Sequence, residues 1–149
     1  MTRNKRIWYA LFVFYCIAMA YLLFGRAEAP GGLPYSQQLS MRLNLVPFHT
    51  VRRQIALLAD FDRPRLIRHA LVNLCGNVIL FIPLGIFLPK LWASLCRFRT
   101  LLPVTALLVT AVELTQLLTL LGRCDIDDLI LNLLGTAIGC GLYRRLWNK

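Results

Sequence analysis

Acidic residues are scarce in this sequence: it has 7 Asp and Glu among 149 residues, against 17 Lys and Arg, so the formal net charge is +10. Hydrophobic residues make up 58% of the chain and charged residues 16%, whereas a soluble domain is about 45–50% apolar. A soluble nucleic-acid binder would cluster its basic residues on amphipathic elements. Here they collect between long uncharged runs, as in membrane proteins. The sequence therefore predicts a membrane protein whose partner is the lipid bilayer and not nucleic acid.

Paired cysteine motifs and histidine clusters are also missing. The cysteines are odd in number, form no C-x-x-C and show no regular spacing, which predicts neither disulfides nor a zinc site. His49 and His69 stand alone, and no Ser–His pair or Cys beside a base offers a nucleophile. We therefore expect no cofactor and no catalytic residue, although an enzyme stays open as an alternative. The cysteines are Cys16, Cys75, Cys96, Cys124 and Cys140.

Four long apolar runs approach the roughly 20 residues that a membrane-spanning helix needs. The first exceeds the ~7–15 apolar residues of a cleavable signal segment, so we expect an uncleaved anchor. The fourth is short, at Leu129–Tyr143, and reaches full length if Arg144 and Arg145 extend their charged ends to the surface. Together the runs predict one all-α domain over residues 1–149, an integral membrane four-helix bundle with spans at about 7–24, 70–88, 101–121 and 129–146.

The orientation follows from Lys and Arg, which are enriched on the cytoplasmic side of a membrane. The N-terminal tail, the loop Lys90–Thr100 and the C-terminal tail hold three basic residues each, close together. The other side spreads its basic residues over the long connection Gly25–His69. We therefore predict a multi-pass protein of the plasma membrane, with both termini cytoplasmic and this connection outside.

The second half of the connection predicts a short amphipathic helix. Apolar residues recur there at helical spacing, with Arg52 and Arg53 beside them. Such a helix either lies on the membrane surface or caps the end of the bundle, and the pattern fits both. Asp62 followed by Pro64 is typical of an N-cap and first turn, here leading into the second span. The apolar residues are Phe48, Val51, Ile55, Leu58 and Phe61.

Polar residues interrupt the apolar spans in one half of the membrane. Asn73 and Asn77 share a face of the second span, Glu113 and Gln116 share a face of the third, and Asn132 lies in the fourth. All of them lie in the half that faces the outer connection. They either join helices by hydrogen bonds or line a polar cleft. A mid-membrane carboxylate costs about 2.5–3.5 kcal/mol, and Gln would serve as well for joining helices, so the cleft is favoured.

The turn GRCDIDD, residues 122–128, holds three of the seven acidic residues. Asp127 or Asp128 is predicted to cap the fourth helix and to meet its dipole. Arg123 is expected to pair with one more carboxylate, Asp125 being the candidate. The remaining carboxylate is then available to a cation, a metal or a ligand amine. Asp125-Ile126-Asp127 has the D-x-D form of some metal sites, but no converging oxygen ligands accompany it, so no metal is predicted.

Glycines Gly135 and Gly139 form a G-x-x-x-G on the fourth span, which lets a neighbouring backbone approach closely. This face could pack against another helix of the bundle or against a second copy of the chain. The motif therefore allows an oligomer through the glycine face.

Four segments follow one another in the chain: NLVPF at Asn44–Phe48, NLCGNVILFIPLGIFLP at Asn73–Pro89, ELTQ at Glu113–Gln116 and GRCDIDDLILNLLGTAIG at Gly122–Gly139. In this order they resemble the VanZ-like family of small bacterial membrane proteins. The resemblance implies a polytopic cell-envelope protein, and the family's namesake is linked to resistance to glycopeptide antibiotics of the teicoplanin type. The polar positions of the family correspond to Asn77, Glu113, Gln116, Arg123, Asp125, Asp127, Asp128 and Asn132.

Two functions follow from these observations. The first is a non-enzymatic membrane protein that binds or shields an amphiphile of the outer leaflet, such as a lipid or a cell-wall precursor, and that affects glycopeptide or lipoglycopeptide susceptibility. The second is an enzyme acting on a lipid-linked or phospholipid substrate, with Glu113 as general base. The candidate ligand-binding residues are Asn73, Asn77, Glu113, Gln116, Arg123, Asp125, Asp127, Asp128 and Asn132.

Overall fold

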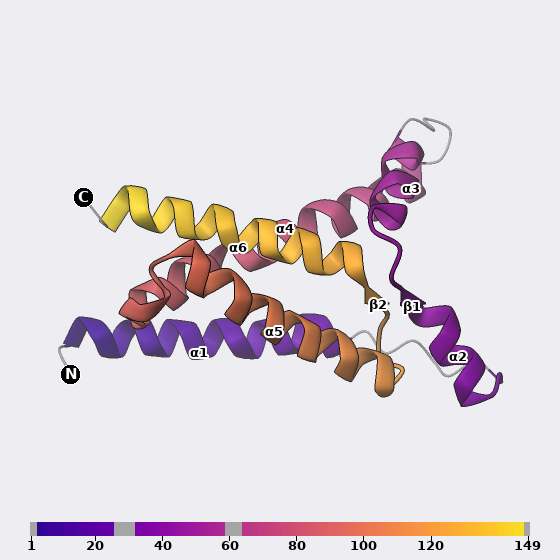
Figure 1. The fold of residues 1–149 in the computed structure, drawn as a ribbon, viewed down its shortest axis with the longest axis horizontal. Helices are drawn as coiled ribbons and strands as arrows, with labels where there is room; N and C mark the ends of the chain where they lie inside the picture. Colours follow the sequence, from indigo (N-terminus) through magenta and orange to yellow (C-terminus); the bar gives the residue numbers. More distant parts are fainter. Residues whose placement is uncertain (1–2, 26–31, 59–63, 148–149) are drawn as a thin grey trace.

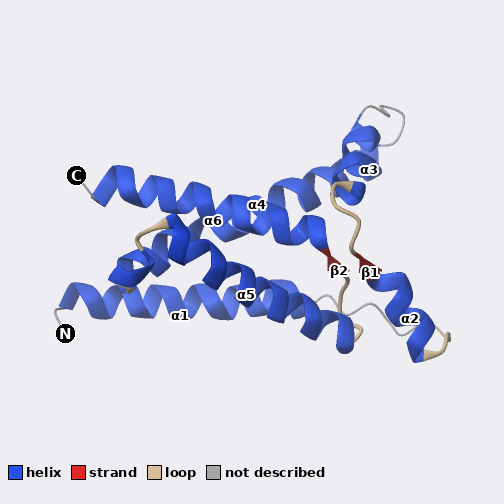
Figure 2. Ribbon diagram, in the orientation of Figure 1, coloured by secondary structure: helices blue, strands red, loops and turns tan. Residues whose placement is uncertain are grey.

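The fold was established from a computed structural model, which describes residues 3–25, 32–58 and 64–147. Within these residues four long apolar helices form the bundle (Figures 1 and 2), and each is long enough to cross a membrane. They are α1 (Arg3–Phe24), α4 (Pro64–Leu91), α5 (Phe98–Leu118) and α6 (Ile126–Trp147). The prediction of an all-α bundle with four spans is confirmed. The predicted N-cap Asp62 and the last apolar position of the amphipathic pattern, Phe61, lie outside the described residues.

The helices begin and end at different residues from the apolar runs. α4 begins with proline at its first helical position, where the missing N–H has no helical partner to lose. α5 ends at Leu118, three residues before the predicted end, because the chain turns out of the helix at Leu120, whose backbone has a left-handed φ of 57°. α6 begins at Ile126, three residues before the apolar run. Hydropathy does not register backbone turns, so the polar first turn of α6 was assigned to the loop.

The glycines of α6 bring it into close contact with α4. A Cβ built on Gly135 would lie 2.1 Å from the carbonyl oxygen of Val78, and one on Gly139 would lie 2.0 Å from that of Ile82. Gly85 of α4 is equally close to the backbone of Thr136. The glycine face is therefore occupied within the chain, by α4, at the positions where an oligomer contact was considered.

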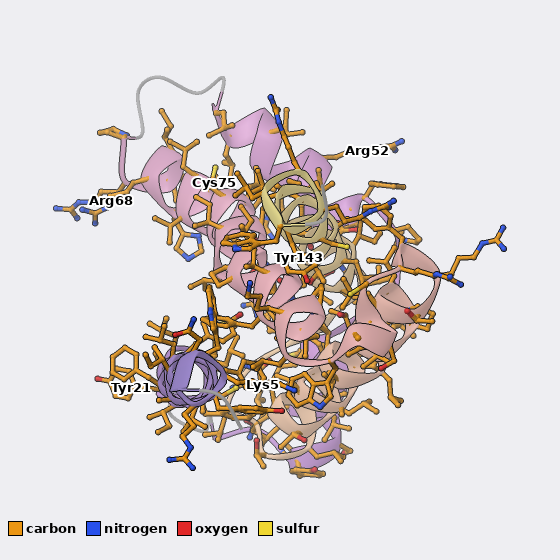
Figure 3. All side chains as sticks on the ribbon, turned by 90° about the vertical axis from the view of Figure 1, so that its left-hand side faces the viewer. Lys5, Tyr21, Arg52, Arg68, Cys75 and Tyr143 are labelled. Atoms are coloured by element: carbon orange, nitrogen blue, oxygen red, sulfur yellow. The ribbon has the colours of Figure 1, made fainter. Side chains whose placement is uncertain are left out.

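The first helix packs more loosely than the others. α1 contacts mainly α4, where Phe12 and Tyr15 stack near Phe87, and it makes little contact with α5. The Tyr15 hydroxyl donates a hydrogen bond of 2.8 Å to the carbonyl of Leu80. Seen end-on in Figure 3, α1 stands apart from the other helices, and Tyr21 points away from them. Much of α1 is therefore left to face lipid.

The connection between α1 and α4 forms an arm across one end of the bundle, opposite the two termini (Figure 1). It comprises α2 (Tyr35–Arg42), β1 (Leu43–Asn44) and α3 (His49–Leu58). β1 pairs in parallel with β2 (Cys124–Asp125), with Leu43 opposite Cys124 and Asn44 opposite Asp125. A short 3-10 helix, η1 (Ala93–Leu95), joins α4 to α5 at the other end.

The amphipathic helix α3 packs against α4 and α6, which is the bundle-capping alternative. Gln54 is buried on its inner side, whereas Arg52 and Arg53 are exposed. Ile55 remains 55% exposed, which leaves an apolar position on the outer side. The arm is tied to the end of α5 as well, because the Tyr35 hydroxyl donates to the carbonyl of Leu118 at 2.8 Å.

Candidate functional site

The pairing of β1 with β2 brings the acidic turn against the arm, and Asp125 is the residue that joins them. Its Oδ1 accepts the backbone N–H of Asp127 at 2.9 Å, and its Oδ2 accepts the Thr50 hydroxyl and the Asn44 amide. A side-chain bond to the N–H two residues later is the N-cap geometry. Asp125 therefore caps α6, and the prediction that Asp127 or Asp128 does so is wrong. The α6 helix begins earlier than its apolar run, which moves the cap with it.

Asp127 caps a different helix. Its side chain is fully buried, and its two carboxylate oxygens accept the backbone N–H groups of Phe48 and Val51 at the start of α3. The bond to Val51 is 3.0 Å long. Phe48 itself has a φ of 61°, a left-handed conformation that is uncommon for a bulky residue. The carboxylate of Asp127 thus holds the arm in place across the bundle.

Glu113 is buried near the same turn. Its Oε2 accepts the backbone N–H of Asp125 at 3.3 Å, and 7% of the residue is exposed. Because α5 ends at Leu118 and the chain then folds back, β2 lies beside Glu113 instead of above it. Glu113 therefore contacts the acidic turn directly through the backbone of Asp125.

Three further polar residues of the spans form hydrogen bonds between elements. Asn77 donates its amide to Asp128 Oδ1, and the amide oxygen of Asn73 accepts from Gln54 at 2.9 Å. Gln116 donates to the carbonyl of Leu23 at 2.6 Å and so joins α5 to α1. In these three cases the polar groups connect helices.

Asn132, in the fourth span, has a buried polar atom that is not hydrogen-bonded within the described residues. Asn132 is 3% exposed, and its side-chain oxygen has no hydrogen-bond partner in the described part of the chain. It lines a hollow of about 220 Å³ between α1, α4, α5 and α6. A buried amide oxygen without a partner is costly, which marks this hollow as a place for a polar ligand group or water. Predicted site residues that line it are Asn77, Glu113, Gln116, Arg123, Asp128 and Asn132.

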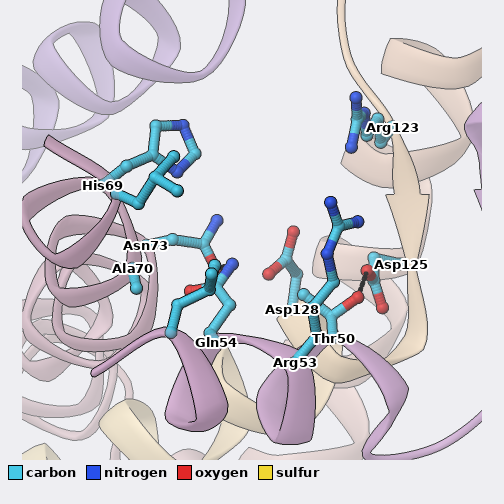
Figure 4. Close-up of a pocket in the computed structure, with 11 residues that line it drawn as sticks. Thr50, Arg53, Gln54, His69, Ala70, Asn73, Arg123, Asp125 and Asp128 are labelled. Atoms are coloured by element: carbon cyan, nitrogen blue, oxygen red, sulfur yellow. Dashed lines mark hydrogen bonds between the residues drawn. The ribbon is translucent and has the colours of Figure 1, made fainter. Parts of the chain in front are cut away.

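A larger cavity of about 470 Å³ lies between α3, α4 and the acidic turn (Figure 4). Arg53 of α3 and Asp128 of α6 stand side by side and point into it, and Thr50 is bonded to Asp125 at its edge. Arg123, which is exposed, lines both this cavity and the smaller hollow. The predicted pair of Arg123 with Asp125 is not formed, because Asp125 is engaged by Asn44 and Thr50. The cavity is lined by Thr50, Arg53, Gln54, Leu57, Leu66, His69, Ala70, Asn73, Arg123, Asp125 and Asp128.

A model of the VanZ/LLP1 family matches residues 12–148, nearly the whole chain. The chain belongs to this family. No curated protein and no solved structure matches it. The resemblance found in the four ordered segments is thus confirmed, and in this VanZ/LLP1 chain each of the four contributes at least one residue to the arm end of the bundle: Asn44, Asn73, Glu113 and Asp125.

The arm supplies site residues of this VanZ/LLP1 protein that the sequence reasoning missed. They are Asn44, Thr50, Arg53 and Gln54. Asn44 had a signal, since it opens the NLVPF segment, but its partner 81 residues later was not foreseeable from spacing. Gln54 could be suspected only as a polar residue on the inner side of an amphipathic helix.

Metal binding and thiol chemistry find little support around the turn. Asp125 and Asp127 are engaged by different donors, and the described residues contain no group of three His, Cys, Asp or Glu side chains that could hold a metal. Burial raises the pKa of the Cys124 thiol, and the negative charges of Glu113 and Asp125 raise it further. A thiol with a raised pKa is a poor nucleophile at neutral pH because little thiolate is present.

Proposed function

We propose that this protein binds the polar head of an amphiphile in the outer half of the membrane, and that it does so without transforming the ligand. The observation that carries the proposal is the cavity of about 470 Å³ at the arm end of the bundle, with arginine and aspartate side chains side by side. Four-helix membrane proteins need no such polar cavity for stability, because burying polar groups in a membrane is costly.

The charges in the cavity suit a phosphate-bearing head. Arg53 and Arg123 both line the cavity, no hydrogen bond of either guanidinium group is found within the described residues, and the positive charge of Arg123 acts on Asp128, so both groups can contact an anion there. Arginine binds phosphate through paired N–H groups. Asp128 lies beside Arg53 and offers an acceptor to an amine or hydroxyl group of the same head. The arrangement fits a head that carries both a phosphate and a donor group.

Two kinds of amphiphile share this chemistry: a membrane phospholipid and a lipid-linked cell-wall precursor with its diphosphate. Both reach the cavity if the arm faces outward, as the distribution of basic residues predicts. They differ greatly in mass, so a direct measurement of the bound species separates them.

The test is native mass spectrometry of the protein purified in mild detergent. We expect a co-purifying phosphate-bearing amphiphile on the wild type, and at least a tenfold loss of its occupancy in the double variant Arg53→Gln/Arg123→Gln. Arg52→Gln is the matched control, because Arg52 is the exposed neighbour on α3 and does not line the cavity. Equal occupancy in the double variant and in the control would refute the proposal, as would the absence of any bound species from the wild type.

The same samples test the enzymatic alternative, in which Glu113 acts as general base on a lipid-linked substrate. Turnover would leave product on the wild type and intact substrate on Glu113→Gln, whereas binding alone predicts the same species on both. A role in glycopeptide susceptibility is tested separately, by the inhibitory concentration of teicoplanin for cells that express each variant. We propose that the wild type raises this concentration and that Arg53→Gln/Arg123→Gln abolishes the increase.

A further inference from the structure

A second, apolar groove lies between α1, α4 and α5, and the proposed function leaves it unused. Its volume is about 210 Å³. Phe81, Leu84 and Val109 are buried at its floor, and Cys16 and Ala20 lie on its exposed side. The groove exists because α1 packs on α4 and makes little contact with α5. Cys16 and Ala20 are four residues apart, so two small side chains open the same face of α1.

The groove adjoins the polar cavities. Leu23 lines the groove, the hollow that contains Asn132 and one further hollow between α1 and α4. Asn77 lines both of these hollows. The hollow that contains Asn132 in turn shares Arg123 and Asp128 with the large cavity. The charged cavity at the arm end, the hollow that contains Asn132 and the apolar groove along α1 therefore lie next to one another, with Leu23 between the last two. A charged cavity beside an apolar groove matches the two parts of an amphiphile, its polar head and its hydrocarbon chain.

Resting on the proposed function, we infer that this groove holds one hydrocarbon chain of the amphiphile whose head occupies the arginine-lined cavity. The arginine side chains hold the charged head in the cavity. The groove that adjoins the neighbouring hollow at Leu23 then takes the hydrocarbon chain along α1. Moving a chain from the bilayer into the groove gains no hydrophobic free energy, since lipid tails are as apolar as the groove. The groove therefore sets the position of the chain by its shape, while the head supplies the selectivity.

The experiment uses a phosphatidylethanolamine with a photoactivatable diazirine in one acyl chain, reconstituted with the full-length protein. After irradiation, adducts are mapped by peptide mass spectrometry. We expect adducts on groove residues such as Met19 and Val112, reduced at least fivefold by Ala20→Phe, which fills the groove. Cys16→Phe is a second filling variant, should the first fail to fold. Val13→Phe is the matched control, because Val13 is 54% exposed on α1 and does not line the groove.

The head variant Arg53→Gln/Arg123→Gln separates the two proposals. If head and chain belong to one molecule, it reduces the groove adducts as strongly as Ala20→Phe does, while adducts on the outer face of α1 stay unchanged. Groove adducts that persist in the head variant would mean that bulk lipid fills the groove, and would overturn the inference alone. Head binding by native mass spectrometry without groove adducts would do the same. If no amphiphile is found bound to the wild type, the proposed function itself is refuted.

Discussion

Asp127 lies in the first turn of α6, yet its Oδ2 accepts the backbone N–H of Val51 in α3 at 3.0 Å, across 76 residues of sequence. The arm that covers the site is thus held by a carboxylate that belongs to the bundle. The neighbouring Asp125 holds the start of α6 and the side chains of the arm together. Two of the three aspartates of the turn therefore cap helices, whereas Asp128 points into the cavity, whose edge Asp125 also lines.

Replacing Asp127 with alanine should release the arm. The change leaves two backbone N–H groups at the start of α3 without an acceptor, and the loss of an N-cap together with buried unpaired donors amounts to roughly 3 kcal/mol. Asp127→Asn keeps one acceptor and should lose less. Unfolding in mixed micelles measures the total loss of stability. Hydrogen exchange at the amides of Phe48 and Val51 reports directly whether the arm is released. Unchanged exchange at these two amides in Asp127→Ala would contradict the capping role.

Leu120 should prefer glycine to alanine. Its φ of 57° places it in the left-handed region, where a side chain is strained by about 1–2 kcal/mol. Leu120→Gly and Leu120→Ala both remove the side chain, so their difference isolates the backbone, and we expect the glycine variant to be about 1 kcal/mol more stable. At Leu114, inside α5, the same comparison should have the opposite sign. The free energies of unfolding of these four variants decide the point, and the same sign at both positions would contradict it.

Gly139→Ala should force α6 away from α4. The added Cβ would lie 2.0 Å from the carbonyl oxygen of Ile82, so the backbones must separate, at a cost of about 1–3 kcal/mol or more. Gly141→Ala is the matched control, because a Cβ there meets nothing within 4 Å. It should be neutral, or should stabilise the helix by up to about 1 kcal/mol. Equal melting temperatures of the two variants would show that the contact between α4 and α6 is looser than described.

The orientation can be tested with single cysteines in a background without the native ones. Ser36→Cys in α2 and Arg145→Cys at the end of α6 are both exposed and lie at opposite ends of the bundle. If both termini are cytoplasmic, a membrane-impermeant maleimide labels Ser36→Cys in intact cells and labels Arg145→Cys only after permeabilisation. The reverse pattern would place the cavity on the cytoplasmic side and would exclude an outer-leaflet ligand.

The candidate site was predictable in part. Hydropathy singled out Asn77, Glu113 and Asn132 because a polar residue in an apolar span stands out against its neighbours, and each lies at the site. The roles of the aspartates were not predictable in this way. Capping was assigned from the apolar run of α6, and the true start of that helix depends on the pairing of Asn44 with Asp125.

The sequence by itself determined the class of the protein, its four helices, its family and the end of the bundle at which polar residues gather. These properties follow from composition and local spacing, since a membrane span needs a long apolar run and tolerates few polar residues. Only the tertiary structure decided which carboxylate caps which helix, that Glu113 lies beside the turn, and that Arg53 of the arm shares a cavity with Asp128. The hydrogen bonds between the arm and the turn join residues 75 or more positions apart, and Glu113 meets Asp125 over 12 positions. Such contacts depend on how the chain folds back, which no local pattern records.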